Sequence, residues 1–582
     1  MADLTNAQIA AAFDELADLY ELDGAVQYRV IAYRNAARTV RDSAVSVAQL
    51  ARDGKVTQLP NIGRTLEEKL IALDSTGDIP AAQKLRAKIP AGLISVMHLP
   101  GFGPKRARRL YDELGIDSLD ALRAAAEAGQ IRGLRGFGAK VEENLKRVLS
   151  EQAEDGPAPR ILLSRALPVA DQIVGALRAH PASDRVEVAG SLRRMTDSVK
   201  DLDIIATASD PAALAGTLRE LPLVESVHSA GEAGARVSTH SGMKVDLKVV
   251  EPDQFGNVLQ HFTGSKAHNV ALRESAVRRG LHVSEYGILD DAIAETVRCA
   301  TEEEVYATLG LVWIPPELRE GRGELEAAAP GGGGLPDLIE LEDVRGELHC
   351  HTTLSDGRET AEEMAAAARE RGLEYLAITD HSASHGFGDH VTPEALRARI
   401  DEIRALNERM DGIEVLIGTE CNILPDGSLD YEDELLAQLD WVIASVHTSF
   451  QMAERQMTDR MIAAIEHPLV DAIGHPTGRK IETRPPYALD VERVIEAAAR
   501  TGTMIEINAS PDRRDLNEIH ARAAAEAGVR ILVNTDAHSA RELDLRRYGI
   551  ATARRAWLTA DHVANTRPWP EFAPLRKRAR SA

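Results

Sequence analysis

Cysteine is scarce in this sequence, whose 582 residues include only Cys299, Cys350 and Cys421. Three cysteines do not supply a disulfide framework, so we expect a protein of the reducing cytoplasm. The sequence also lacks a run of eighteen or more apolar residues, and it begins with polar residues. Neither a membrane span nor a signal peptide is therefore expected.

An excess of positive charge is missing as well. Lysine and arginine number 68 against 91 aspartates and glutamates, which gives a net charge of −23. Such a chain does not attract nucleic acid through a long-range field. The charge is uneven, however, because residues 1–150 hold 21 basic and 19 acidic side chains and the rest of the chain carries −25. Any contact with nucleic acid is therefore expected to be local.

The stretch VEVAGSLRRMTDSVKDLDII, residues 186–205, carries the most chemical information. It predicts a strand, a Gly-Ser turn, a basic segment and a second strand with Asp201 and Asp203. Residues two apart in a strand share a face, and Asp246, in the strand-like run 243–250, offers a third carboxylate. Three carboxylates can hold two magnesium ions about 4 Å apart for in-line phosphoryl transfer. The alternative is an exposed edge strand with solvated acids.

The turn between the two strands predicts a phosphate site. Gly190 lets the backbone approach a phosphate closely, and the Ser191 hydroxyl and the Arg194 guanidinium can bind triphosphate oxygens. Together with the three carboxylates, this arrangement resembles the nucleotidyltransferase palm of the family X DNA polymerases, the group that includes DNA polymerase beta. The resemblance implies that the carboxylates are catalytic metal ligands and that Ser191 and Arg194 contact the incoming nucleotide.

Residues 1–150 are helical by their apolar spacing. The form apolar-x-Gly-Phe-Gly-x-Lys precedes a helix at Leu99–Leu110 and Leu134–Leu145, and residues 59–70 hold a weaker copy. Glycines permit the tight turn, and the next helix presents its amides to a phosphate. These segments resemble helix-hairpin-helix motifs, which hold the DNA backbone without reading sequence; an ordinary glycine-capped helical hairpin is the alternative. The implied DNA-binding residues are Gly101, Gly103, Lys105, Arg106, Gly136, Gly138 and Lys140.

The weaker hairpin has a further implication. In the N-terminal domain of the DNA polymerase beta type, a lysine just after this hairpin is the Schiff-base nucleophile that removes 5′-deoxyribose phosphate. Lys69 falls at that position. Because a lysine attacks an aldehyde only as the neutral amine, and Glu67 and Glu68 precede it, an exposed lysine paired to acid is the alternative.

A second part of the nucleotide site is expected downstream of the palm. The run from Phe262 to Ser265 resembles the thumb-side turn of the family, in which a Gly-Ser kink lets the backbone contact the nucleotide's sugar and base. His261 departs from the pattern, since DNA polymerase beta has a tyrosine there that checks the ribose 2′-OH. The resemblance implies nucleotide binding by Gly190, Ser191, Arg194, Phe262, Gly264, Ser265, Asn269 and Arg273.

Residues 336–582 predict a barrel. Seven short apolar strands alternate with helical stretches, and six strands end at histidines or carboxylates. The carboxyl ends of parallel strands form the active-site face of such a barrel. One His-x-His on a surface strand is a weak signal, whereas ligand-type residues after six strands indicate a metal site. The expected strands are GELHC, YLAIT, EVLIG, DWVIASV, DAIG, TMIEIN and RILVN.

This set resembles the polymerase and histidinol phosphatase (PHP) domain, a distorted (β/α)7 barrel with up to three metal ions. Mixed imidazole and carboxylate ligands suit zinc, manganese or iron better than magnesium. The expected chemistry is phosphoester hydrolysis, as a 3′→5′ exonuclease or 3′-phosphatase, with Arg514 as a candidate phosphate clamp. The implied ligands are His349, His351, Asp356, His381, Glu420, His447, His475, Asp536 and His538.

The fold class is therefore multidomain, α+β and α/β, as the chain length also favours. The predicted segments are a helical DNA-binding and candidate lyase domain (1–86), a helix-hairpin-helix domain (87–150), a nucleotidyltransferase palm (160–251), a thumb-side nucleotide-binding subdomain (252–318), a linker (319–336) and a PHP phosphoesterase domain (337–575).

These resemblances together imply a bacterial family X DNA polymerase with a C-terminal PHP nuclease. It is expected to add deoxynucleotides to 3′-OH ends in short gaps, with Mg²⁺ or Mn²⁺ in the palm and Zn²⁺ or Mn²⁺ in the PHP domain. The expected partners are gapped or nicked double-stranded DNA and dNTPs, for a monomer near the nucleoid. The alternative is a DNA-repair phosphoesterase whose palm is a non-catalytic scaffold. A recruiting scaffold without activity and a small-molecule phosphatase each explain less of the chain.

Overall fold

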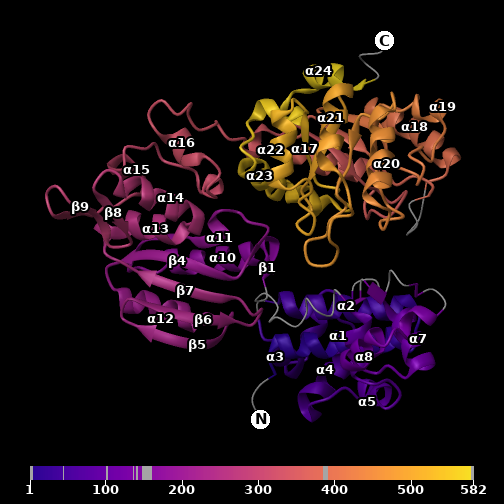
Figure 1. Cartoon of the computed structure of the whole chain (residues 1–582), viewed down its shortest axis with the longest axis horizontal. Helices are drawn as coiled ribbons and strands as arrows, with labels where there is room; N and C mark the ends of the chain where they lie inside the picture. Colours follow the sequence, from indigo (N-terminus) through magenta and orange to yellow (C-terminus); the bar gives the residue numbers. More distant parts are fainter. Residues whose placement is uncertain are drawn as a thin grey trace. The chain divides into compact units, whose positions relative to one another are not determined.

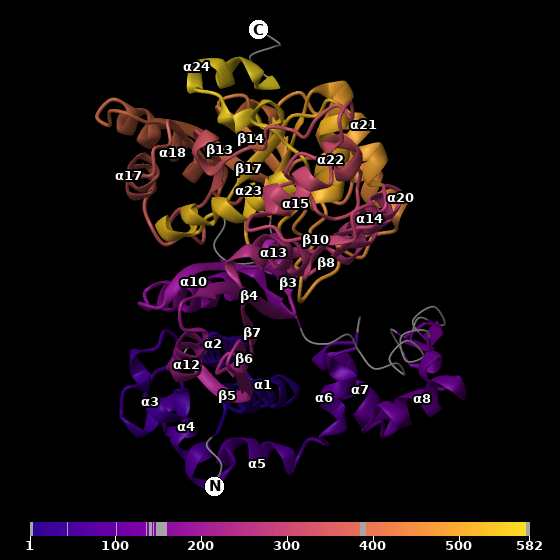
Figure 2. The same cartoon turned by 90° about the vertical axis from the view of Figure 1, so that its left-hand side faces the viewer.

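The structure is a computed structural model, shown in two views in Figures 1 and 2. It describes residues 4–43, 45–99, 102–134, 137–138, 142–143, 145–146, 160–384 and 391–577. The chain forms two compact units. One comprises residues 1–161, 165–188 and 200–251, and the other comprises residues 162–164, 189–199 and 252–582.

The first unit begins with a helical region around one apolar core, which runs from Ile9 to Leu145. Its first helix is fixed by a capping box, because the Thr5 hydroxyl accepts from the Gln8 amide and the Gln8 side chain accepts from the Thr5 amide. No helix in the described parts of the chain is long and apolar enough to cross a membrane. The helices are α1 (Asn6–Leu22), α2 (Gln27–Asp42), α3 (Val47–Arg52), α4 (Arg64–Thr76), α5 (Pro80–Arg86), α6 (Gly92–Met97), α7 (Pro104–Leu114) and α8 (Leu119–Glu127).

The same unit contains a five-stranded sheet in the order β2-β4-β7-β6-β5. Strand β4 is antiparallel to β2 and parallel to β7, and helix α12 (Pro211–Glu220) packs on β5 and β6. The strands are β2 (Ser183–Val188), β4 (Asp201–Ala208), β5 (Val224–Gly231), β6 (Gly234–Thr239) and β7 (Lys244–Val249). Helix α10 (Leu163–Arg178) and the short strands β1 (Ile161–Leu162) and β3 (Ser198–Val199) adjoin it in sequence.

The thumb-side subdomain, which begins at Pro252 in the second unit, has its own apolar core. Arg319 and Glu324, which the sequence places in the linker, are fully buried. The subdomain therefore extends through helix α16, and the stretch without helix or strand begins after it. The elements of the subdomain are α13 (Phe255–Thr263), α14 (Lys266–Val277), β8 (Leu281–Ser284), β9 (Gly287–Asp290), β10 (Glu295–Val297), α15 (Glu302–Thr308) and α16 (Glu324–Ala328). The short helix α11 (Gly190–Arg193) belongs to the second unit but precedes this subdomain in sequence.

The barrel domain, residues 337–577, contains seven parallel strands in chain order. All seven expected strands are present, and Figure 2 shows helices around β13, β14 and β17. A parallel bridge between Cys350 and Ala537 brings the first and last strands together. The strands are β11 (Gly346–Cys350), β12 (Tyr375–Ile378), β13 (Glu414–Asn422), β14 (Trp441–Ser445), β15 (Ala472–Ile473), β16 (Met504–Asn508) and β17 (Ile531–Asn534). The helices are α17 (Ala361–Glu370), α18 (Pro393–Asn407), α19 (Asp433–Leu436), α20 (Glu454–Glu466), α21 (Val491–Thr501), α22 (Glu518–Glu526), α23 (Arg546–Arg555) and α24 (Trp569–Phe572).

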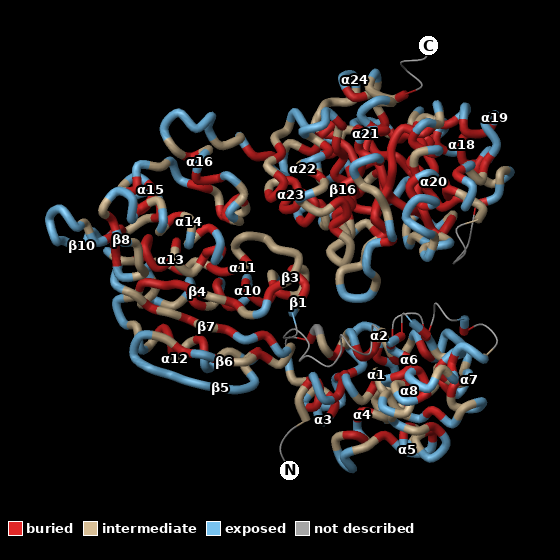
Figure 3. The backbone as a smooth tube through the Cα atoms, in the orientation of Figure 1, coloured by how far each residue is buried: buried red, intermediate tan, exposed pale blue. Residues whose placement is uncertain are grey.

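Two apolar clusters alternate along the barrel strands, whose residues are all buried except Glu414 at the start of β13 (Figure 3). Tyr375, Trp441 and Met504 belong to the inner cluster, and their neighbours in sequence pack against the surrounding helices. Successive side chains of a strand point to opposite faces, so later residues of the inner set also face the interior. In β16 the inner residues after Met504 are Glu506 and Asn508. The interior thus changes from apolar to polar toward the carboxyl ends of the strands.

Candidate metal centre and nucleotide site

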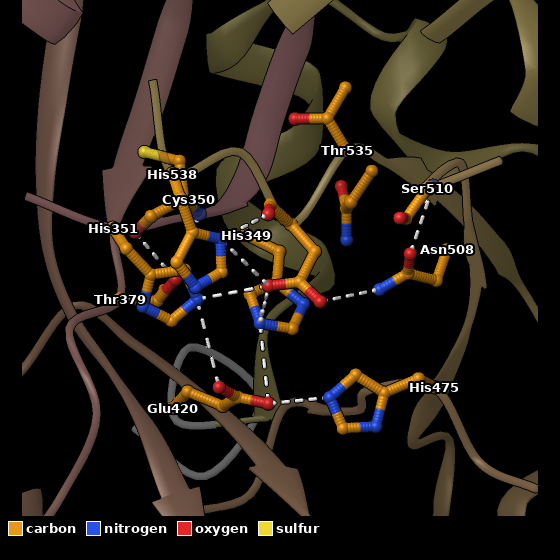
Figure 4. Close-up of polar contacts among 12 residues, drawn as sticks. His349, Cys350, His351, Thr379, Glu420, His475, Asn508, Ser510, Thr535 and His538 are labelled. Carbon is orange, nitrogen blue, oxygen red and sulfur yellow. Dashed lines mark hydrogen bonds and ion pairs between the residues drawn. The ribbon is translucent and has the colours of Figure 1, made fainter. Parts of the chain in front are cut away.

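Glu420 lies at the centre of the polar end of the barrel. Nε2 of His475, His447 and His349 lies 2.8, 3.1 and 3.3 Å from its Oε1. Nδ1 of His381 lies 2.8 Å from its Oε2. Figure 4 shows the carboxylate of Glu420 between His475 on one side and the β11 histidines on the other. The extended strand β13 positions this side chain, since Glu420 lies within the strand rather than after it.

Two aspartates complete the cluster. Nε2 of His351 lies 3.0 Å from Oδ1 of Asp536, and Nε2 of His538 lies 3.3 Å from Oδ2 of Asp356. All nine predicted ligands are therefore brought together. Among the described residues, three groups place their ligand atoms within 4.8 Å of one another. The first group is His351, Asp356, His381 and His538, the second is His349, His351, Glu420 and Asp536, and the third is His381, Glu420 and His447. Because His351, His381 and Glu420 each belong to two of these groups, the groups indicate candidate ion sites that adjoin one another.

The buried polar atoms of this cluster fit metal ions. Both carboxylate oxygens of Glu420 and Nε2 of His349 are buried and make no hydrogen bond to the described residues. Buried acceptors that face one another are costly unless a cation or a proton lies between them. Imidazole nitrogen and carboxylate oxygen together are the ligands that zinc and manganese accept.

The surroundings of His351, His475 and Glu420 favour the protonation states that bind metal. Burial, with the neighbouring His538 and His381, lowers the pKa of His351 to about 3. Burial and the Arg513 charge lower the pKa of His475 to about 4. Burial opposes the charged form of Glu420, but the surrounding imidazoles outweigh it and hold its pKa well below the usual value. Neutral imidazoles and ionised carboxylates are the forms that coordinate a metal. At His349, His381 and His538 burial opposes the charged form, but the neighbouring carboxylates outweigh it and raise the pKa, so a metal ion would have to displace a proton there.

Glu506 supports this cluster and was not predicted from the sequence. Its Oε1 accepts from His349 Nδ1 at 2.8 Å, and its Oε2 accepts from the His475 amide at 2.7 Å. An N–H at Nδ1 of His349 leaves Nε2 free to be a ligand, and a carboxylate partner also raises ligand basicity. The signal that could have identified Glu506 is its inward position in β16, two residues after the inner residue Met504.

The palm carboxylates share one region of the five-stranded sheet. Asp203 of β4 lies opposite Asp246 of β7 in the register, and Asp201 precedes Asp203 by two residues with a buried residue between them. The side chains of all three lie on the less buried face. Asp246 Oδ2 accepts from Arg236 Nε at 3.0 Å. The three groups of ligand atoms found among the described residues do not include these carboxylates.

The nucleotide loop, residues 189–199, contains the predicted phosphate-binding residues. Gly190 has a φ of +66°, a conformation that glycine adopts without strain. Ser191 lies in the short helix α11. Arg194 Nε contacts Glu320 Oε1 at 3.1 Å, and its Nη1 donates to the Thr263 carbonyl at 2.5 Å.

The predicted thumb-side residues lie together. Phe262 lies in the last turn of α13, just before Gly264. Ser265 caps α14 by accepting a hydrogen bond from the His268 amide at 3.2 Å. On α14, Asn269 donates to the His261 carbonyl at 2.8 Å, and Arg273 Nη2 lies 3.3 Å from His261 Nδ1. Asn269 and Arg273 therefore share a helix face, as their spacing predicted.

The helical region brings the two sharp hairpins together. Gly103, with a φ of +37°, precedes α7, whose first turn carries Lys105 and Arg106. The rings of Phe102 and Phe137, one from each hairpin, lie 6.0 Å apart, so the two turns pack as a pair. Of the other predicted residues, Gly138 follows Phe137, whereas Gly101, Gly136 and Lys140 lie outside the described residues.

Lys69 lies on α4 and is half-buried. Its Nζ lies 5.9 Å from the ring centroid of Tyr33, which stacks on Tyr20 at 5.4 Å. Nζ also donates to the Thr65 carbonyl at 3.4 Å. The candidate lyase lysine therefore stands beside an aromatic pair.

Comparison with known proteins covers almost the whole chain. The chain is 37% identical over 567 residues to the DNA polymerase/3′-5′ exonuclease PolX of Bacillus subtilis, covering 97% of this chain and 98% of that protein. The chain belongs to the PolX family. Family descriptions match in the expected order: a helix-hairpin-helix domain at 4–79, a SAM-like helix-hairpin-helix tandem at 93–151, a DNA polymerase beta thumb at 258–320 and a PHP domain at 347–510.

Other relatives match only part of the length of this PolX family member. A probable phosphatase of Caldanaerobacter subterraneus is 37% identical over 203 residues, covering 33% of this chain and 75% of that protein. A probable phosphatase of a Thermoanaerobacter species is 34% identical over 232 residues, covering 38% of this chain and 89% of that protein. Together with the family matches, the seven-stranded barrel confirms the predicted fold class.

The candidate phosphate clamp of this PolX family member is not Arg514. That side chain is buried and donates from Nε to Thr552 Oγ1 at 2.8 Å, away from the metal centre. The adjacent Arg513 instead brings Nε to 3.6 Å from Asp536 Oδ2. Its Nη1 is buried and makes no hydrogen bond to the described residues. Arg513 is thus the arginine placed to meet a phosphate at the cluster.

Proposed function

We propose that this PolX family member fills short gaps in DNA by two-metal nucleotidyl transfer at the palm and removes 3′-terminal nucleotides at the barrel. The observation that carries the polymerase half is the register of β4 and β7, which sets Asp203 opposite Asp246 with Asp201 two residues away. The relative that matches nearly the full chain is named a DNA polymerase and 3′-5′ exonuclease, and this supports both halves.

At the palm, Asp201, Asp203 and Asp246 would hold Mg²⁺ or Mn²⁺. Bound ions would neutralise the charge that develops on the transferred phosphoryl group. Ser191 and Arg194 would hold the triphosphate through a hydroxyl and a guanidinium. The thumb-side turn and the Asn269–Arg273 face of α14 would orient the sugar and base.

At the barrel, the nine clustered residues would hold up to three ions of Zn²⁺ or Mn²⁺. Such ions would polarise the scissile phosphodiester and activate water as Lewis acids. Glu506 would keep His349 in the tautomer that coordinates, and Arg513 would hold the phosphate beside the ions. The same cluster would serve a 3′-phosphatase.

We also propose gapped or nicked double-stranded DNA and dNTPs as the partners, and action as a monomer near the nucleoid. Glycine turns followed by basic first turns, as at Lys105 and Arg106, suit the DNA backbone. Lys69 is the proposed lyase nucleophile because of its position at the weaker hairpin, residues 59–70. These contacts are local, which agrees with the acidic net charge of −23.

The experiment that tests the proposal uses the full chain on a labelled primer beside a one-nucleotide gap, in magnesium and then in manganese. With dNTPs we expect extension, and without dNTPs we expect shortening from the 3′ end. A chain that shortens the primer in both metals but never extends it contradicts the polymerase half.

A second candidate is a repair phosphoesterase whose palm only holds DNA. The contact between Arg236 and Asp246 favours it, because an arginine at 3.0 Å competes with a metal ion for that carboxylate. The three palm carboxylates and the phosphate-binding loop are all present, which favours the polymerase. The gapped-primer assay separates the two.

We expect Arg513→Gln to raise KM for single-stranded DNA in the shortening reaction about tenfold, the effect of losing one charge-assisted hydrogen bond. Initial rates across primer concentrations, without dNTPs, measure this. Arg513→Lys keeps the charge, and its KM for single-stranded DNA is expected to lie between those of the parent and Arg513→Gln. Primer extension by both variants is the internal control, and an unchanged KM for shortening contradicts a role in phosphate binding.

A further inference from the structure

An arginine of the barrel domain is inserted against the nucleotide loop. The Arg514 side chain is 1% exposed, and its Nη1 donates to the Met195 carbonyl at 3.0 Å and contacts Asp197 Oδ1 at 3.1 Å. Its Nε is held by Thr552 of α23 at 2.8 Å. A buried guanidinium with these partners leaves the loop little freedom, because each partner lost would leave a buried charge unpaired.

Two more arginines reach the same loop from other connections of the barrel. Arg479, between β15 and α21, brings Nη1 to 3.0 Å from the second oxygen of Asp197. Arg555, at the end of α23, donates from Nη1 to the Arg194 carbonyl at 2.7 Å and to Glu320 Oε1 at 2.8 Å. Asp197 is thus bound from both sides, and two successive carbonyls of the loop are fixed.

The opposite side of the loop is held by the thumb-side subdomain. Arg193 forms a two-pronged contact with Glu302, with both distances 2.8 Å. The carboxylate of Glu320 accepts from Arg194 as well as from Arg555, so it joins the loop, the thumb-side subdomain and the barrel domain. Charge-assisted, two-pronged contacts fix orientation more firmly than neutral hydrogen bonds do.

We propose that Arg514, Arg479 and Arg555 are positioning residues for nucleotide binding, so that the barrel domain sets the loop that receives the dNTP triphosphate. This inference rests on the proposed function of Ser191 and Arg194. None of the three arginines needs to touch the substrate, since each acts on the backbone or on a carboxylate of the loop or its support. Arg513 and Arg514 are adjacent, so one peptide serves both the metal centre and the nucleotide loop.

The test compares Arg514→Met and Arg514→Lys with the parent in single-nucleotide extension and in shortening of a single-stranded primer. For Arg514→Met, KM for the dNTP is expected to rise about tenfold while kcat changes by less than about threefold, since a misplaced loop weakens binding. Shortening is expected to keep the parent's rate. Arg514→Lys, which keeps the charge, is expected to restore part of the affinity.

Two further variants keep the test open if Arg514→Met does not fold. Asp197→Asn removes the carboxylate on the loop side, and its side chain is 25% exposed, so it is the milder change. Arg493→Gln breaks a surface ion pair with Asp459 in the same domain and should alter neither reaction. An unchanged dNTP KM in Asp197→Asn and the Arg514 variants overturns the inference, as does an equal loss of both activities.

Failure of the proposed function gives a different result. If the parent does not extend a primer, calorimetric titration with dATP and magnesium replaces the kinetic assay. About tenfold weaker binding by Asp197→Asn then supports the positioning role without polymerase activity. A parent that binds no dATP overturns both the nucleotide site and the inference.

Discussion

Glu420→Gln is expected to slow 3′-end shortening at least a hundredfold, to about the rate of a protein without bound metal in the barrel, while primer extension continues. Glutamine keeps the shape of the side chain and removes its charge. Four imidazoles direct a nitrogen at this carboxylate within 3.3 Å, so the loss of its charge affects much of the cluster. Because neighbouring imidazoles hold its pKa well below the usual value, Glu420 carries a charge throughout the neutral range.

Two measurements check this expectation. Shortening of a labelled single-stranded primer gives the rate, and elemental analysis of the dialysed protein gives the metal content, which should fall with the rate. Glu434→Gln, an exposed change on α19 of the same domain, is the matched control. A variant with full metal content and the parent's shortening rate would show that the cluster is not the nuclease site.

The barrel ligands could be predicted because the signal is local. Each apolar strand is short, and a ligand-type residue stands at or just beyond its end, so strand parity and barrel geometry place the side chains together. Glu506 was missed although it obeys the same parity. Its role depends on His349, which is 157 residues away in sequence, and no local pattern encodes such a pairing.

The sequence also named Arg514 as the candidate phosphate clamp where the structure favours Arg513, and the physical reason is similar. Sequence position places both arginines after the sixth strand, but it does not say which one faces the metal centre. Arg514 has a φ of +45°, and it is turned toward Asp197 and the Met195 carbonyl, more than three hundred residues away in sequence. Only the assembled second unit defines that direction.

The predicted linker, residues 319–336, begins before the stretch that lacks helix and strand, which follows α16. The sequence after Leu318 is rich in glycine and charge, which is typical of a connection. Arg319 is nevertheless fully buried because Glu302 accepts from two of its nitrogens, at 2.5 and 3.0 Å. Charged residues are buried when their partners are fixed elsewhere in the fold, and a composition window cannot detect those partners.

Asp203→Asn is expected to slow primer extension about a thousandfold and to leave shortening intact. Asp203 lies opposite Asp246, so the loss of its charge removes one of the three proposed carboxylate ligands of the two-ion site. Several kcal/mol of charge stabilisation come from such a site, and about 1.4 kcal/mol corresponds to a factor of ten in rate. Asparagine has the same shape, so the sheet should keep its register.

Single-turnover extension on one-nucleotide-gapped DNA measures this effect, and Glu225→Gln, on the exposed edge strand β5 of the same sheet, is the control. Extension at the parent's rate in Asp203→Asn would mean that the catalytic carboxylates lie elsewhere. Loss of both activities would indicate misfolding rather than chemistry. The reciprocal pattern with Glu420→Gln is the decisive result, because two independent sites on one chain require each variant to lose one reaction and keep the other.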